Sequence, residues 1–272
     1  MTDPPTNPLE LVSFRSPPVQ EIAFAVQLLN SQLSLESIVD IGRALKPLFP
    51  VQQLQPALPR MTEPGFQQFL ISVGAPLPRF WFVSEDGLRL VQVQEDRVAF
   101  NWRGLGRGVP YPRYERLRAE FAEHLELLGE VVPELEGMGL RADFCELTYV
   151  NELEAPGSGA EHPPLDAILR VAQPLNYADF LPPPDNAEWT GQWTIRREPE
   201  RSAGRLTAAA QPGSRQRDQQ PIYLLTMTGA LPGEVAGSEA VFEQLDLAHE
   251  WIVRGFADLT TKEMHDRWGR TR

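Results

Sequence analysis

Residues 79–103, RFWFVSEDGLRLVQVQEDRVAFNWR, predict a three-stranded antiparallel meander. Aromatic and β-branched residues mark each strand, and a tight-turn signal separates each strand from the next. The expected strands are Arg79–Ser84, Leu88–Gln94 and Arg97–Arg103, with Asp86-Gly87 and Glu95-Asp96 as the turns. Because a two-residue loop fixes the register of a hairpin, the two turns together also predict which side chains face one another.

The predicted register sorts the side chains of the meander onto two faces. One face is apolar and holds Phe80, Phe82, Val91, Val93, Val98, Phe100 and Trp102. The other face mixes polar and apolar groups and holds Trp81, Val83, Leu88, Leu90, Gln92, Asn101 and Arg103. We expect helices to cover the first face and the second face to stay uncovered.

Working outward from the meander, the rest of the chain alternates strand and helix patterns. The expected strands are Val19–Leu28, Arg141–Asn151, Glu188–Arg196, Arg205–Gln211 and Pro221–Leu231. The expected helices are Leu35–Lys46, capped by Ser34, then Tyr111–Glu130, Pro164–Ala172, Ser238–Leu259, and a tail helix that a Thr260-x-x-Glu263 capping box begins. The apolar stripe of the first helix is predicted to hold Leu35, Ile38, Val39, Ile41 and Leu45.

Each half of the chain runs strand, helix, several antiparallel strands and long helix. We therefore predict an α+β fold in which two similar halves, residues 1–135 and 136–272, form one extended antiparallel sheet with helices on one face. The order of elements resembles the duplicated saddles of TATA-binding-protein-like folds. The sequence does not decide whether the halves are one domain or two, or whether Gly204–Gln220 is a hairpin or a loop.

Composition excludes several classes of protein. The chain has 272 residues and a net charge of −12, which argues against a nucleic-acid binder that depends on a positive surface. No apolar stretch is long enough to span a bilayer, and the proline-rich beginning lacks a secretory signal. The single cysteine, Cys145, excludes an internal disulfide and fits the reducing cytoplasm. We expect a cytoplasmic protein that does not bind a membrane.

Standard catalytic and cofactor motifs are absent. The chain has no phosphate-binding P-loop and no nucleophile elbow, and Gly104–Gly108 lacks the glycine spacing of a dinucleotide site. One cysteine and four scattered histidines cannot form a cysteine-based zinc site. We expect no metal and no cofactor, and a structural role for the Cys145 thiol.

Candidate binding residues lie on the mixed face and on the strand Cys145–Asn151. The partner-binding set is Trp81, Leu90, Gln92, Asn101, Arg103, Glu146, Tyr149 and Asn151. Trp, Arg and amides on an uncovered face suit a partner surface, and Glu146 needs a partner such as Arg103 if it is buried. The competing interpretation is a charge pair that only fixes the strand register.

His249 and His265 form a second candidate group. With Glu146 they would supply an acid–base or metal cluster. The alternative is that His249 is a half-buried histidine satisfied by a carboxylate, and His265 a surface residue.

Several motifs together resemble a sporadically distributed, uncharacterised bacterial family of about this length. They are Pro17-Pro18-Val19-x-Glu21, Gln92-x-Gln94-x-Asp96-Arg97, Asn101-Trp102-Arg103, Tyr111-Pro112-x-Tyr114, Cys145–Asn151, and the tail Ala248-His249, Thr260-Thr261, His265 and Trp268-Gly269-Arg270. The resemblance implies no catalytic residue. Its patchy occurrence implies an association with defence or toxin–antitoxin loci.

Three hypotheses follow. The first is a non-catalytic interaction protein, defence- or antitoxin-associated, that binds a protein partner, with a homodimer left open. The second is a small-molecule-binding helix-grip protein with a pocket lined by Trp189, Trp193, Tyr223 and Met227. The third is a hydrolase or nucleotidyl enzyme that uses Glu146, His249 and His265.

Overall fold

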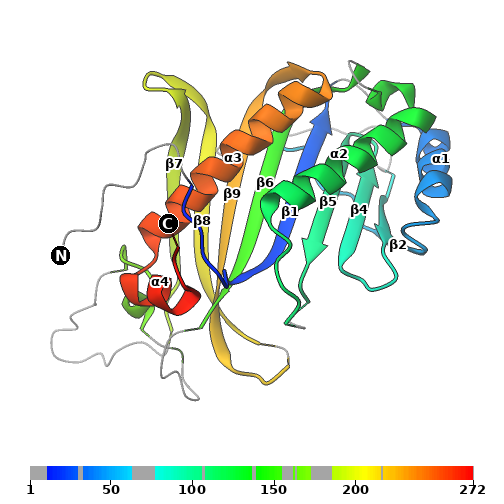
Figure 1. Ribbon diagram of the computed structural model, residues 1–272. Helices are drawn as coiled ribbons and strands as arrows, with labels where there is room; N and C mark the ends of the chain where they lie inside the picture. Colours follow the sequence, from blue (N-terminus) through cyan, green and yellow to red (C-terminus); the bar gives the residue numbers. More distant parts are fainter. Residues whose placement is uncertain are drawn as a thin grey trace.

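A computed structural model describes residues 11–29, 33–62, 77–105, 108–136, 139–154, 162, 164–172, 186–215 and 217–271. It is an α+β structure built on a nine-stranded antiparallel sheet (Figure 1). The strands are β1 (Val19–Leu28), β2 (Val51–Gln55), β3 (Arg79–Val83), β4 (Arg89–Gln94), β5 (Arg97–Arg103), β6 (Arg141–Leu153), β7 (Trp189–Glu198), β8 (Arg201–Ser214) and β9 (Pro221–Ala236). Their order across the sheet is β2-β3-β4-β5-β1-β6-β9-β8-β7.

The predicted meander register is confirmed in both hairpins. Phe82 is opposite Val91 between β3 and β4, and Val91 is opposite Phe100 between β4 and β5. The predicted apolar face therefore does turn toward the helices, and the mixed face turns away from them. Two strand boundaries differ by one residue, because β3 ends at Val83 rather than Ser84 and β4 begins at Arg89 rather than Leu88.

The sequence prediction missed β2, which lies within a proline-punctuated connector. Within the described part of the chain, β2 is an edge strand that pairs only with β3, and most of its residues are exposed. A strand that buries no face has no alternating apolar pattern to reveal it. The stretch Gly204–Gln220, left open above, is a hairpin in which β8 runs to Ser214 and β9 begins at Pro221.

The described residues form four α-helices and two short 3-10 helices. They are α1 (Leu35–Leu45), α2 (Tyr114–Val131), η1 (Pro133–Leu135), η3 (Leu165–Ala167), α3 (Ser238–Leu259) and α4 (Lys262–Trp268). Ser34 caps α1 as predicted, accepting a hydrogen bond from the amide of Ser37 at 3.0 Å. The predicted stripe of α1 was too wide, because Leu35 and Val39 are 52% and 43% exposed.

Three helix predictions need correction. α2 begins at Tyr114 rather than Tyr111, since Arg113 has a φ of 77° that a helix cannot contain. The predicted helix Pro164–Ala172 contains only the single turn η3. The tail helix is capped by Thr261 rather than Thr260, whose hydroxyl instead bonds the carbonyl of Phe256.

The helices α1, α2 and α3 all lie on one face of the sheet (Figure 1). Side chains such as Phe24, Phe100, Phe121 and Leu147 are buried between the sheet and the helices. α3 approaches β9 closely at Gly229, where an added Cβ would lie 2.8 Å from the Cβ of Ala248. The small residues therefore let a long helix seat directly on the strand, which removes apolar surface from water.

The two ends of the described chain meet beside α3. The amide of Thr271 donates to the carbonyl of Ser13 at 2.8 Å, and Phe14 packs edge-on against Phe256 and Trp268. The boundary predicted between residues 135 and 136 falls just before β6, which pairs with β1 and so joins the two halves in one sheet. Among the described residues, none of the helices is both long enough and apolar enough to cross a membrane.

Candidate functional site

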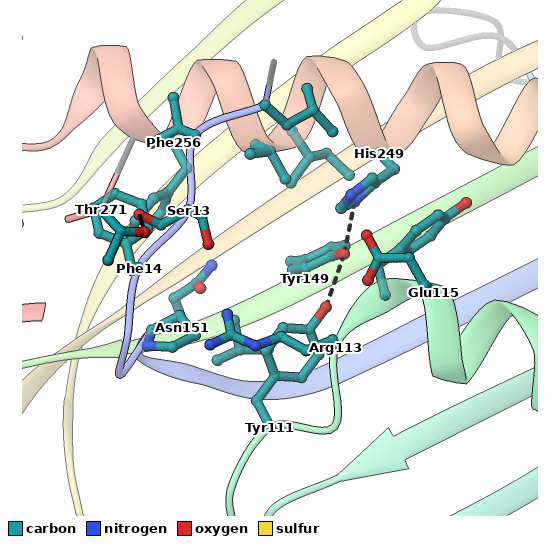
Figure 2. Close-up of a pocket in the computed structure, with 17 residues that line it drawn as sticks. Ser13, Phe14, Tyr111, Arg113, Glu115, Tyr149, Asn151, His249, Phe256 and Thr271 are labelled. Atoms are coloured by element: carbon teal, nitrogen blue, oxygen red, sulfur yellow. Dashed lines mark hydrogen bonds between the residues drawn. The ribbon is translucent and has the colours of Figure 1, made fainter. Parts of the chain in front are cut away.

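A cavity of about 450 Å³ lies on the helix side of the sheet, where the two halves meet. Figure 2 shows its walls, which come from β6, α3, the residues leading into α2, and the two ends of the described chain. Its polar lining groups include Tyr111, Arg113, Glu115, Tyr149, Asn151 and His249. Aromatic and aliphatic side chains supply the rest, among them Phe14, Val19, Ile252 and Phe256.

A chain of three side chains crosses the cavity wall (Figure 2). The hydroxyl of Tyr149 lies 2.8 Å from Nδ1 of His249 and 3.3 Å from the hydroxyl of Tyr111. Tyr149 is on β6, His249 on α3, and Tyr111 in the loop before α2. The chain therefore links three elements that are distant in sequence, and it does so on the inner side of the sheet.

His249 is a neutral side chain at physiological pH. Burial lowers its pKa to about 4, and the charge of Asp246 opposes this only partly. Its ring lies flat against Tyr114, with ring centroids 3.7 Å apart. The Tyr114 hydroxyl donates to Asp246 at 2.7 Å, and Arg118 donates two hydrogen bonds to the same carboxylate.

His249 has one ring nitrogen without a partner among the described residues. No described residue hydrogen-bonds Nε2 of His249, although the side chain lines the cavity and is 8% exposed. A neutral imidazole has one donor and one acceptor nitrogen, so Nε2 offers one hydrogen bond of a kind set by the tautomer. Asn151, also buried, donates to the carbonyl of Leu225 and lines the same cavity.

Charged groups stand at the start of α2, beside the cavity. Arg113 and Glu115 are both exposed and both line it, and the Arg113 guanidinium lies 5.9 Å from the centre of the Tyr111 ring. Burial raises the pKa of Tyr111 and holds that of Tyr149 well above its ordinary value, so both phenols stay protonated. The cavity thus combines neutral hydrogen-bonding groups inside with opposite charges at its rim.

The predicted mixed face carries a different network, on the far side of the sheet. Gln92 accepts hydrogen bonds from Trp81 and Arg79, each at 2.9 Å, and donates to Asn101 at 2.6 Å. Asn101 in turn donates to Glu21 at 2.7 Å. This row, which we call the Gln92 row, runs from β3 through β4 and β5 to β1.

The mixed face is only partly open. Leu90 and Asn101 are buried, whereas Trp81, Gln92 and Arg103 are half-buried. The stretch 57–62 covers one end of this face: Gln94 exchanges two hydrogen bonds with the backbone of Leu58. Gln27 makes an equivalent pair with the backbone of Met61, so that end is occupied by the chain itself.

Glu146 lies on this mixed face, away from the cavity. Alternation along β6 turns Glu146 to the side opposite Tyr149 and Asn151. The eight residues predicted as one binding set are therefore divided between the two faces of the sheet. Burial raises the pKa of Glu146, and the charge that opposes this belongs to Arg97 rather than to the predicted Arg103.

Arg103 instead packs on Trp81. Its guanidinium carbon lies 5.7 Å from the centre of the Trp81 ring, and that of Arg79 lies 5.3 Å from it. Trp81 thus contacts two cations, an arrangement that attracts both guanidinium groups to the negative ring face.

The predicted cluster of Glu146, His249 and His265 is not assembled. Glu146 is on the opposite face of the sheet from His249, and His265 is buried in the tail helix α4. Nε2 of His265 lies 2.8 Å from the Thr260 hydroxyl, and Nδ1 lies 3.3 Å from Arg270. His265 is therefore a buried residue that anchors the tail, and not the surface residue that the alternative proposed.

The pocket predicted around Trp189, Trp193, Tyr223 and Met227 is also not formed as expected. Tyr223 and Met227 are buried in the core, and Trp189 packs beside Trp193. Trp193 lines a separate groove with Trp251 of α3. Cys145 is buried, with a pKa raised to about 12 by burial, and the described residues contain no group of three metal-ligating side chains.

The comparisons with known proteins add no relative: no family model matches the chain, and no curated protein matches it. Sequence reasoning named Tyr149, Asn151 and His249 but missed the role of Tyr111 and Tyr114. A Tyr-Pro-x-Tyr stretch that leads into the first residue of a helix was the available signal, because aromatic residues there are placed to pack beneath the helix start.

Proposed function

We propose that this protein is a non-catalytic binding protein whose cavity between the two halves holds a small molecule. The observation that carries the proposal is the cavity itself, which is lined by the neutral His249, whose Nε2 has no hydrogen-bond partner among the described residues. Nε2 is not among the fully buried unpartnered side-chain atoms of the described residues, so it is accessible to a molecule in the cavity and could hydrogen-bond it.

The titration of the cavity groups supports binding over proton-transfer catalysis. A general acid or base works best when its pKa lies near the operating pH. Burial lowers the pKa of His249 to about 4, and it raises the pKa of Tyr149 well above its ordinary value. Neither group would exchange a proton readily at neutral pH, whereas both can hold a ligand by hydrogen bonds.

The lining indicates the chemistry of the ligand. A volume of about 450 Å³ lies within the range of roughly 300–1,000 Å³ common for small-molecule sites. Phe14, Tyr111 and Phe256 would contact an aromatic or aliphatic body. His249 and Asn151 would meet a polar end that both donates and accepts hydrogen bonds.

Native mass spectrometry of the protein purified from its host tests this proposal. We expect a retained mass that disappears on denaturation. Val253→Trp would fill the cavity from α3 and abolish retention, while Val171→Trp, at the separate groove beside Trp193, would leave it unchanged. A ligand-free mass for the wild-type protein, or equal retention by the Val253→Trp variant, would contradict the proposal.

The mixed face is a second candidate site, for a protein partner. Trp81 and Arg103 are half-buried rather than sealed, and tryptophan and arginine are the residues that most often dominate interfaces. We keep for this face the hypothesis of a cytoplasmic, defence- or antitoxin-associated partner. Pull-down with Trp81→Ala plus Arg103→Ala tests it, since an unchanged set of partners would remove its basis.

We further propose that the two halves derive from a duplicated unit of the TATA-binding-protein-like kind. Outward from the central β1–β6 pair, the order β5-β4-β3 on one side matches β9-β8-β7 on the other. Each half closes with a long helix, α2 or α3, on the same face of the sheet (Figure 1). A solved relative with a single half in a homodimer would test this relationship.

A further inference from the structure

Among the residues that the structure describes, the edge strand β2 lacks the usual protection of a sheet edge. It ends the sheet beside β3, four of its five residues are exposed, and Leu54 is 64% exposed. Its sequence VQQLQ contains no charge and no proline. Natural sheets normally protect an edge with charges, prolines or bulges, because an unprotected edge pairs with another strand.

The opposite edge of the same sheet is protected. β7 carries Arg196, Arg197 and Glu198 at its end, and its pairing with β8 is irregular at Ile195/Arg196 and at Arg196/Glu198. Both features discourage pairing with a further strand. The lack of edge protection is therefore specific to β2 and is not shared by the other edge of this sheet.

Many of the exposed large apolar side chains belong to the stretch of chain that runs from α1 to just beyond β2. Of the eleven exposed large apolar residues that the structure describes, six fall between residues 35 and 58. They are Leu35, Val39, Leu48, Val51, Leu54 and Leu58. A concentration of this kind marks an interaction surface, whereas single exposed apolar residues are ordinary.

Helix α1 extends this surface beside the strand. An added Cβ at Gly42 would lie 3.0 Å from the Phe82 ring and 3.8 Å from the side chain of Gln52, so α1 sits over β2 and β3. Leu35 and Val39 are one turn apart on a side of α1 that neither the sheet nor α2 covers. Figure 1 shows α1 at the same end of the molecule as β2.

The charge of this region fits a second copy of the chain. Residues 33–62 carry two acidic and three basic side chains, against −12 for the whole chain. In α1 the acidic Glu36 and Asp40 precede Arg43 and the C-cap residue Lys46, and Asp40 also pairs with Arg43 within the helix at 2.6 Å. Two copies of α1 related by a two-fold axis would run antiparallel, which sets the acidic half of each against the basic half of the other.

We propose that β2 pairs antiparallel with β2 of a second copy, so that one sheet continues through the dimer and the two α1 helices pack across the axis. Such an interface is isologous, because the same surface serves both subunits. The rest of the surface is strongly acidic, so two copies repel each other there. The near-neutral region around β2 is therefore the part of the surface where two copies can approach.

Sedimentation velocity over a wide range of concentration tests the proposal. We expect wild-type protein to sediment as a dimer of twice 30.6 kDa. The double variant Gln53→Lys/Leu54→Lys should sediment as a 30.6 kDa monomer with an unchanged circular dichroism spectrum. The matched control Thr190→Lys/Gln192→Lys, on the protected edge, should remain a dimer.

Cysteine cross-linking supplies an independent measurement. Cys145 is buried, so a cysteine introduced at Gln52, Gln53 or Leu54 would be the accessible thiol. We expect mild oxidation to give a disulfide-linked dimer from at least one of these variants and none from Gln192→Cys. Wild-type protein that is monomeric at every concentration, or a dimer that survives the β2 lysines, would overturn the proposal even if the cavity ligand is confirmed.

Discussion

The imidazole of His249 lies parallel to the phenol ring of Tyr114, with centroids 3.7 Å apart and planes inclined by 4°. Tyr114 opens α2 in the first half of the chain, and His249 lies in the middle of α3 in the second. This contact joins the two helices above the β1–β6 pair and places His249 against the cavity.

Replacing Tyr149 by Phe should destabilise the fold. The change leaves Nδ1 of the buried His249 and the Tyr111 hydroxyl without their partner. An unsatisfied buried group costs about 1–3 kcal/mol, and we expect a loss of that size in urea unfolding. Tyr111→Phe is the matched control, since it keeps the shorter Tyr149–His249 bond and should cost less. Equal losses from both variants would contradict this account of the chain.

Stability should fall as the pH drops from neutrality toward 4. His249 has a pKa of about 4 in the folded protein and about 6.5 when unfolded, so the unfolded chain binds more protons in this window. One such histidine contributes at most about 3 kcal/mol, reached only at the acidic end. Urea unfolding at a series of pH values measures the slope.

The variant His249→Gln separates this histidine from the other titrating groups. Burial also lowers the pKa values of His124 and His265 to about 4, and it raises those of Glu21 and Glu146. The raised carboxyls act in the opposite sense, because their protonation at lower pH favours the folded state. We expect His249→Gln to reduce the slope of the unfolding free energy against pH by an amount that corresponds to at most one proton. An unchanged slope would show that His249 is not held in its neutral form in the folded protein.

Asn101→Leu should disrupt the Gln92 row. Asn101 accepts from Gln92 and donates to Glu21, so its loss leaves both partners unsatisfied on a largely buried face. We expect a destabilisation of about 1–3 kcal/mol in urea unfolding. Adding Glu21→Leu should recover part of it, since removing both members of a buried pair costs less than removing one. If the double variant were less stable than Asn101→Leu by a further amount of about 1–3 kcal/mol, the pairing of Asn101 with Glu21 would be contradicted.

Phe14→Ala should loosen the junction of the two chain ends. Phe14 packs against Phe256, Trp268 and His265, and truncating a buried phenylalanine costs about 3–5 kcal/mol. Hydrogen exchange should accelerate first at the amides of Arg15, Ser16 and Thr271, which bond across the junction. Uniform acceleration throughout the sheet would instead indicate global destabilisation without a local opening.

Local signals were enough to predict much of the secondary structure. The turn at Glu95-Asp96 set the register of its hairpin, and Ser34 set the start of α1. β1 and α3 have the predicted boundaries, Val19–Leu28 and Ser238–Leu259. These features depend on residues a few positions apart, whose preferences act before any distant contact forms.

The candidate site could be anticipated only in part. Tyr149 and His249 were both named, but they were assigned to different groups, and His249 was joined with Glu146, which faces the other side of the sheet. The alternation within Cys145–Asn151 correctly placed Glu146 and Tyr149 on opposite sides. It could not show which of the two sides would face α3.

Periodicity and turn chemistry along the chain determined the strands of the meander, their facing residues and the long amphipathic helix, because each is decided by neighbours in sequence. Packing between distant segments decided the rest: the pairing of β1 with β6, the capture of β2 as an edge, and the meeting of Tyr111, Tyr149 and His249 around one cavity. Tyr149 and His249 are 100 positions apart. Their contact forms only when the sheet has assembled and α3 has docked on it, so no preference of neighbouring residues could reveal it.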